Sequence, residues 1–183
     1  MNLERDILTR CADPAFRAWM ADLLVELCEV DTTPLPDVAA MAARASAVFD
    51  IISRELSACN LPGATLARPA ISPAIGEHPA FTALHHTKTP QRPEGMTVAE
   101  AFAGRTNLLF LADGPDGPGN GAAVNAHIDV VAPYVPPRRD GQRILGRGTC
   151  DDKGGTVAII AAIRIVADLI HAGAAELCNA ITA

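Results

Sequence analysis

Aromatic residues are scarce in this sequence, which has one Trp, one Tyr and five Phe among its 183 residues. Proteins that bind single-stranded nucleic acids stack the bases on aromatic side chains, and this chain has too few for such a platform. The formal net charge of −6 also disfavours a polyanionic partner. We therefore expect neither a nucleic acid nor a membrane surface among its partners.

The sequence also lacks paired cysteines, an apolar leader and a long uninterrupted apolar run. Its five cysteines are odd in number and never spaced C-x-x-C. That pattern argues against a disulfide framework or a zinc knuckle and favours a reducing compartment. The first residues are charged, unlike a signal peptide, and Arg164 and Asp168 interrupt the most apolar segment, so we expect no membrane span. These absences predict a cytoplasmic protein.

Apolar residues make up 49% of the chain, enough for a substantial core, and the length favours one domain over residues 1–183. Helical periodicity or helix signals occur in four segments, at residues 14–27, 38–56, 97–102 and 156–172. Strand-like segments and turns lie between or after them, with strands at residues 65–67, 107–111, 122–131 and from 177 onward, and turns at 113–121 and 139–142. The predicted fold is α/β, a three-layer, doubly wound and mostly parallel or mixed sheet that is incomplete at the C-terminus.

Residues 61–95 interrupt this alternation. The stretch is rich in proline and shows no sustained period, so it is either an ordered insertion or a long loop. Long loops inside compact domains are often functional.

The first candidate site is a polar triplet on the predicted strand 122–131. Asn125, His127 and Asp129 alternate with apolar residues, so they share one face of the strand. Polar groups on a central strand are costly unless something uses them. A metal would use the imidazole of His127, with Asp129 fixing its tautomer. The alternative is a histidine satisfied by an internal hydrogen bond.

The second candidate is the glycine-flanked segment Gly146-Arg147-Gly148-Thr149-Cys150-Asp151-Asp152-Lys153-Gly154-Gly155. Asp151 lies just before an apolar helix, where backbone N–H groups favour negative charge, and its two oxygens could bridge two cations. The alternatives are an acidic N-cap and a tight turn. A phosphate loop is disfavoured because the spacing is wrong and two aspartates would repel phosphate. The remaining histidines, including the adjacent pair at residues 85–86, carry no motif.

Together the two motifs resemble the zinc-dependent exopeptidase and deacylase family of carboxypeptidase G, aminoacylase, acetylornithine deacetylase, succinyl-diaminopimelate desuccinylase and the carnosinase-like dipeptidases. The matching residues are Ala126 to Val131 and Gly146 to Gly155, with a weaker match at Glu29 to Thr33. The resemblance runs from Pro14 to the end of the chain, apart from the proline-rich stretch. It implies the N-terminal part of such a catalytic domain.

That resemblance implies specific roles. His127 would ligate one zinc, Asp151 would bridge two zincs, Asp129 would orient His127, and the peptide bond between Asp151 and Asp152 would be cis. The complete site would hold two Zn²⁺ ions, with Co²⁺ or Mn²⁺ as alternatives, and would act on a small peptide or N-acyl amino acid. The family's glutamate pair, its other ligands and its lid domain, which forms homodimers, have no counterpart in this sequence.

Two classes of function therefore stay open. One is a metal-dependent hydrolase of amide or peptide bonds, of which this chain is a truncated N-terminal part that is inactive alone. The other is a non-catalytic stub or interaction module that retains the fold. The number of ligands leaves the same two classes open. A zinc site needs three or four protein ligands, and the two motifs supply two.

Overall fold

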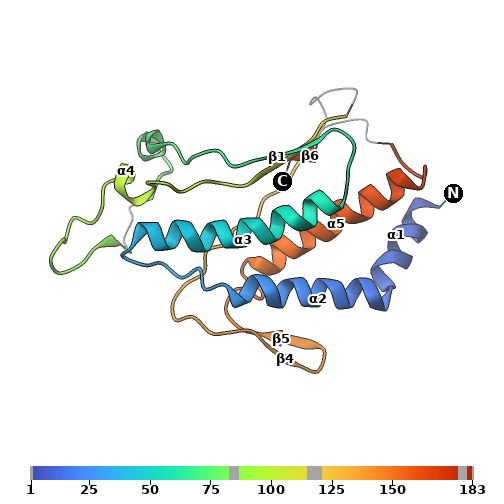
Figure 1. Ribbon diagram of the computed structural model, residues 1–183, viewed down its shortest axis with the longest axis horizontal. Coiled ribbons are helices and arrows are strands. Elements are labelled where there is room, and N and C mark those ends of the chain that lie inside the picture. The colour runs from blue at the N-terminus through green and yellow to red at the C-terminus, as the bar shows by residue number, and fades with distance from the viewer. Residues whose placement is uncertain (1, 83–86, 115–120, 177–180, 183) are drawn as a thin grey trace.

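The computed structural model describes residues 2–82, 87–114, 121–176 and 181–182 (Figure 1). Its α-helices are α1 (Leu3–Ala12), α2 (Pro14–Glu29), α3 (Val38–Ala58), α4 (Val98–Ala101) and α5 (Lys153–His171), and a 3₁₀ helix, η1, spans Pro73–Glu77. Its strands are β1 (Ala64–Ala67), β2 (Leu109–Ala112), β3 (Ala122–Ala123), β4 (Arg138–Asp140), β5 (Arg143–Leu145) and β6 (Ile181–Thr182).

Four strands form a mixed sheet in the order β1-β2-β6-β3. Strand β2 is antiparallel to both of its neighbours, and β3 runs parallel to β6. Strands β4 and β5 form a separate antiparallel hairpin, with Gly141 at its turn in the left-handed region (φ 59°). The protein is thus a mixed α/β structure, as the alternation of elements predicts.

Helices α2, α3 and α5 run roughly along the long axis of the molecule, and α5 packs against the other two (Figure 1). Local signals explain where α2 and α3 begin. The side chain of Asp13 accepts a hydrogen bond from the backbone of Ala15 and precedes Pro14 at the first helical position. The side chain of Asp37 caps α3 by accepting a hydrogen bond from the backbone of Ala40. Both predicted helices are confirmed to within two residues at each end.

The core lies where α2, α3 and α5 meet β2. Its most deeply buried side chains include Leu27, Val48, Phe110, Val157 and Ile160. Burying such side chains supplies most of the stability of a domain of this kind. By length and composition α5 is long and apolar enough to cross a membrane, so Arg164 and Asp168 do not by themselves decide against a span. In this structure its buried side chains belong to the core.

The predicted strand 122–131 was also wrong in extent. Ladder pairing stops at Ala123, although the backbone N–H of Val124 still donates to Thr182 (2.9 Å). Beyond that point the backbone bonds to the segment after α2 instead. The hydroxyl of Thr32 donates to the carbonyl of Ile128 (2.5 Å), and the N–H of Val130 donates to the carbonyl of Thr32 (3.4 Å). The alternation of polar and apolar residues therefore indicated an extended backbone, but most of this segment lies outside the sheet.

One helix boundary also differs, one helix was not predicted, and two predicted segments lie partly outside the described residues. Helix α5 begins at Lys153, three residues before the predicted start. The prediction placed Gly154 and Gly155 before the helix, whereas the structure includes both in its first turn. Helix α1 was not predicted, since it has an N-cap but buries no side chain. Most of the predicted turn at 113–121 and the start of the predicted strand at 177–183 lie outside the described residues, whereas β6 lies within that strand.

Candidate metal centre

The two motifs meet at one place on the surface. Nε2 of His127 lies 3.1 Å from Oδ1 of Asp151, and the two side chains are 51% and 85% exposed. His127 comes from the extended segment after β3, and Asp151 from the turn just before α5. They are 24 positions apart in sequence, with the β4–β5 hairpin between them, so their approach is a tertiary contact.

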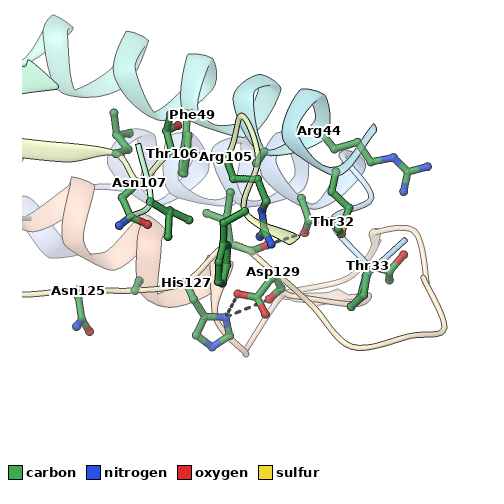
Figure 2. Close-up of a pocket in the computed structure, with 18 residues that line it drawn as sticks. Thr32, Thr33, Arg44, Phe49, Arg105, Thr106, Asn107, Asn125, His127 and Asp129 are labelled. Carbon is green, nitrogen blue, oxygen red and sulfur yellow. Dashed lines mark hydrogen bonds and ion pairs between the residues drawn. The ribbon is translucent and has the colours of Figure 1, made fainter. Parts of the chain in front are cut away.

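The other ring nitrogen of His127 faces Asp129 (Figure 2). Nδ1 lies 3.0 Å from the backbone carbonyl oxygen of Asp129 and 3.5 Å from its carboxylate Oδ1. A neutral ring that donates its proton from Nδ1 to this carbonyl keeps a lone pair on Nε2, the nitrogen that faces Asp151. Asp129 therefore orients the ring through its backbone as well as its carboxylate. Sequence reasoning had considered the carboxylate alone.

The surroundings of His127 raise its pKa. Partial burial acts to lower the pKa, but the carbonyl of Asp129 and the negative charges of Asp129, Asp151 and Asp152 outweigh burial. The same negative potential that favours a proton on the ring would favour a cation beside it. The chemistry of this donor set therefore suits a metal ion.

Asp152 also contributes to the site. Its Oδ2 accepts a hydrogen bond from the backbone N–H of His127 (3.3 Å). The peptide bond between Asp151 and Asp152 is cis, as the family resemblance implies. The two successive carboxylates thus contact the ring and the backbone of the same histidine. Sequence analysis assigned Asp152 no role of its own, although its place next to Asp151 was the available signal.

Glycines let the turn before α5 pass close to its surroundings. Gly148 has φ +87°, a conformation that side chains disfavour. A Cβ on Gly154 would lie 2.5 Å from the carbonyl oxygen of Thr149, closer than real Cβ contacts allow. Both positions therefore require glycine, and the turn that they permit brings Asp151 just before α5.

Lys153 anchors this turn from inside the protein. Its side chain is 1% exposed, and Nζ donates a hydrogen bond to the carbonyl oxygen of Val30 at the end of α2 (2.7 Å). Burial lowers the pKa of Lys153, an effect that Cys28 and Asp31 partly offset. Sequence analysis placed this lysine in the motif without a role, because nothing in the sequence identifies a carbonyl acceptor 123 residues away.

The end of α2 makes further contacts to the same region. The hydroxyl of Tyr134 donates to the carbonyl oxygens of Cys28 (3.1 Å) and Glu29 (3.0 Å). Together with the bond from Thr32 to Ile128, these contacts tie the residues around His127 to the end of α2. The segment that gave the weaker third sequence match, residues 29–33, is therefore a structural support shared by both motifs.

A pocket of about 610 Å³ opens beside His127 (Figure 2). It lies between α3, the segment that follows α2, the residues before β2 and the segment after β3. His127 and Asp129 line it, together with Asn125, Arg44 and Arg105. The volume falls in the range of small-molecule sites. Asp151 is outside the pocket lining, so the pocket adjoins the two motifs rather than enclosing both.

His127 and Asp151 are the residues that could hold a metal ion. Zinc–ligand bonds of about 2.0–2.2 Å place neighbouring ligand atoms roughly 3–3.5 Å apart, and the observed 3.1 Å separation fits two ligands of one ion. In the part of the chain that the structure describes, however, no group of three or more His, Cys, Asp or Glu side chains could hold an ion. The described residues therefore fit part of a metal centre.

The other histidines lie apart from this centre where they are described. Nδ1 of His78 accepts a hydrogen bond from the backbone of Ala80 (3.2 Å), and Nε2 of His171 lies 3.0 Å from the carbonyl oxygen of Asn60. The adjacent histidines at positions 85 and 86 fall outside the described residues.

Comparison with known sequences identifies the segment that carries both motifs. Residues 123–178 match the model of peptidase family M20/M25/M40. This segment belongs to that family. It contains His127 and Asp151, and the resemblance predicted from the two motifs is confirmed. No curated protein sequence matches the chain significantly.

Solved structures extend the likeness beyond the M20/M25/M40 segment. Human carnosine dipeptidase 1 matches with a TM-score of 0.63 at 14% identity, over 98% of this chain and 33% of that protein. A tripeptidase from Staphylococcus aureus subsp. aureus Mu50 matches with a TM-score of 0.50 at 16% identity, over 91% of this chain and 35% of that protein. At these identities the likeness shows the fold, and the chain spans about a third of the length of either protein.

Proposed function

We propose that this chain is part of a metal-dependent hydrolase that cleaves amide or peptide bonds, of the exopeptidase, dipeptidase or N-acyl amino acid deacylase type. The contact between Nε2 of His127 and Oδ1 of Asp151 carries the proposal. Membership of residues 123–178 in a peptidase family, and the fold shared with a dipeptidase and a tripeptidase, support peptide substrates. We also propose that the complete protein is cytoplasmic, that it forms a homodimer, and that its catalytic domain has three layers.

In this proposal His127 and Asp151 would hold zinc, and Asp151 would be shared with a second ion. Co²⁺ or Mn²⁺ are the alternatives. A bound divalent ion supplies a water of lowered pKa and polarises the substrate carbonyl. Asp129 keeps the proton on Nδ1 of His127, so that Nε2 remains a donor atom. Lys153 and the glycines hold Asp151 at the start of α5.

A second candidate is a stub or interaction module without catalysis. The observation that favours it is the ligand count, since the described residues supply two ligands and a catalytic zinc site needs three from the protein. Both candidates share the expectation that the 183 residues alone bind zinc weakly and hydrolyse nothing. The two candidates differ in a longer protein that supplies the missing ligands, since only the hydrolase would then bind zinc tightly and turn over substrate.

The test is to read the coding sequence around these residues and to express the longest open frame beside the 183-residue chain. Zinc binding is measured by calorimetry, and hydrolysis with dipeptides and N-acyl amino acids. The hydrolase proposal expects tight zinc binding and turnover in a longer protein, with both lost in His127→Ala and Asp151→Ala. If the open frame ends at residue 183, or the longer protein binds zinc no better than the 183-residue chain, the stub is correct.

A further inference from the structure

Five consecutive backbone carbonyls, at residues 28–32 around the end of α2, accept hydrogen bonds from other parts of the protein. Donors in the segments that carry His127 and Asp151 bond the carbonyls of residues 28, 29, 30 and 32. The remaining carbonyl, that of Asp31, accepts from Nη1 of Arg44 on α3 at 3.2 Å. Helix α3 therefore reaches, through Arg44, the stretch of backbone that supports both motifs.

Arg44 holds the side chain of Asp31 as well as its backbone. The same nitrogen, Nη1, donates to Oδ2 of Asp31 at 2.8 Å. The other carboxylate oxygen, Oδ1, accepts from the backbone N–H of Thr33 (2.9 Å) and from its hydroxyl (2.7 Å). An aspartate that accepts from the N–H two residues later closes a turn over the residue between them, here Thr32. Partial burial acts to raise the pKa of Asp31, but the bonds from Thr33 and Arg44 outweigh burial and lower the pKa, so the carboxylate is ionised at neutral pH.

Thr32 carries this constraint to the segment of His127. Its hydroxyl donates to the carbonyl of Ile128 (2.5 Å), and its own carbonyl accepts from the N–H of Val130 (3.4 Å). The two bonds lie on either side of Asp129, whose carbonyl oxygen is 3.0 Å from Nδ1 of His127. A shift of Thr32 would therefore move the group that orients the His127 ring.

We propose that Arg44 and Asp31 are positioning residues, which set the orientation of the His127 ring through Thr32. This role rests on the proposed function, in which the ring binds a metal ion. Figure 2 shows Thr32 between Arg44 and the segment that carries His127. The side chains of Arg44 and Asp31 are 37% and 26% exposed, and partly exposed ion pairs contribute little to the free energy of unfolding. The main effect of this pair is therefore local, on the place of Thr32.

Hydrogen exchange of backbone amides tests this coupling independently of the proposed function. It is measured by NMR on the 183-residue chain without metal. The reporter is the amide of Val130, which donates to Thr32 and belongs to a residue that is 4% exposed. Arg44→Met removes both bonds to Asp31, whereas Arg44→Lys keeps a charged donor.

The matched control is Arg54→Met. Arg54 also lies on α3 and also links it to α2, because its Nη2 lies 2.7 Å from Oε2 of Glu26. It is outside the lining of the pocket beside His127. Urea unfolding of the Arg44 and Arg54 variants separates a local effect from a loss of global stability.

In Arg44→Met we expect the Val130 amide to exchange at least about 10-fold faster than in the wild type, the effect of losing a hydrogen bond to a charged group. Arg44→Lys should stay near the wild-type rate, because one nitrogen makes both bonds to Asp31. Arg54→Met should leave the Val130 amide unchanged, while its midpoint of urea unfolding matches that of Arg44→Met. Asp31→Ala should also speed exchange, and its effect should combine less than additively with that of Arg44→Met.

A longer protein that binds zinc gives a second measurement. There Arg44→Met should lower zinc affinity and kcat by about 10-fold, the lower end of the effect of groups that orient a ligating histidine. KM should stay nearly unchanged, and Arg44→Lys should restore zinc affinity and kcat. A rise in KM alone would mean that Arg44 contacts the substrate, and would overturn its positioning role.

Two results of the exchange experiment would overturn the coupling. One is an unchanged Val130 amide in Arg44→Met. The other is an equal acceleration in Arg54→Met, which would show a general loosening of α3. A Val130 amide that responds to Arg44→Met alone, with no zinc binding in any longer protein, would remove the proposed metal centre and leave the coupling of Arg44 to the His127 segment in place.

Discussion

Nζ of Lys153 donates a 2.7 Å hydrogen bond to the carbonyl oxygen of Val30 while its side chain is 1% exposed. The bond joins the first residue of α5 to Val30, the residue that follows α2. Tyr134 and Thr32 attach the segment of His127 to the same end of α2. The segments that carry His127 and Asp151 therefore share one support, and a change at this support should alter both.

Replacing Lys153 tests that support. In Lys153→Met the carbonyl of Val30 would lose its partner inside the protein. We expect a loss of about 1–3 kcal/mol in the free energy of unfolding, because an unsatisfied buried acceptor carries that cost. In a longer protein that binds zinc, zinc affinity should also fall, because Asp151 lies two residues before Lys153. Urea unfolding and zinc titration measure the two effects, with Arg143→Met on the exposed hairpin as control. Unchanged stability would show that water or another group replaces the ammonium.

Removing the carboxylate of Asp129 tests how the His127 ring is oriented. Groups that orient a ligating histidine typically change metal affinity about 10–100-fold. We expect Asp129→Ala to fall near the lower end of that range, because the backbone carbonyl that holds Nδ1 at 3.0 Å remains. Zinc affinity and turnover should fall together, whereas the exposed Asp140→Ala should change neither. Zinc affinity equal to wild type would mean that the carbonyl alone sets the ring.

At Gly154 we expect the usual stabilising effect of a Gly→Ala substitution in a helix to be reversed. Gly→Ala inside a helix ordinarily stabilises a protein by roughly 0.5–1 kcal/mol. Here the new Cβ would lie 2.5 Å from the carbonyl oxygen of Thr149, so we expect Gly154→Ala to lower the free energy of unfolding. Ala158→Gly, at an exposed position of the same helix, should cost the ordinary helix penalty. Thermal unfolding of both variants measures the two effects. A higher melting temperature in Gly154→Ala than in the wild type would contradict the predicted clash.

Glu100 provides a test by pH, away from the metal site. A hydrogen bond from Arg92, followed by bonds from the side chain and backbone of Thr97, lowers its pKa to about 2. Because the pKa is lower in the folded state, the ionised carboxylate stabilises the fold above its unfolded pKa of about 4.3. That contribution is lost as the pH falls toward 2.

Carbon-13 NMR of the glutamate carboxyls measures this pKa directly. Arg92→Gln should raise the pKa of Glu100 toward its ordinary value, whereas Arg138→Gln should leave it in place. In Glu100→Gln, the dependence of stability on pH between about 4 and 2 should decrease. A Glu100 that titrates at its ordinary value in the wild type would contradict both its ion pair with Arg92 and its hydrogen bonds from Thr97.

Local chemistry was enough to predict part of this protein from its sequence. The apolar spacing of residues 14–27 and 38–56 predicted two helices, and the caps that the structure shows at Asp13 and Asp37 agree with it, because such signals act over a few residues. The two motifs were likewise sufficient to identify the family, since residues 123–178 contain both of them.

Tertiary contacts decided the rest. The segment around His127 alternates like a strand, yet hydrogen bonds to Thr32 keep it outside the sheet. The 3.1 Å contact between His127 and Asp151 depends on how the segments on either side of the hairpin are held. The acceptor of Lys153 lies 123 residues away. Motifs determine which chemical groups are available, but burial and long-range hydrogen bonds determine which of them meet, because these arise only when distant segments pack together.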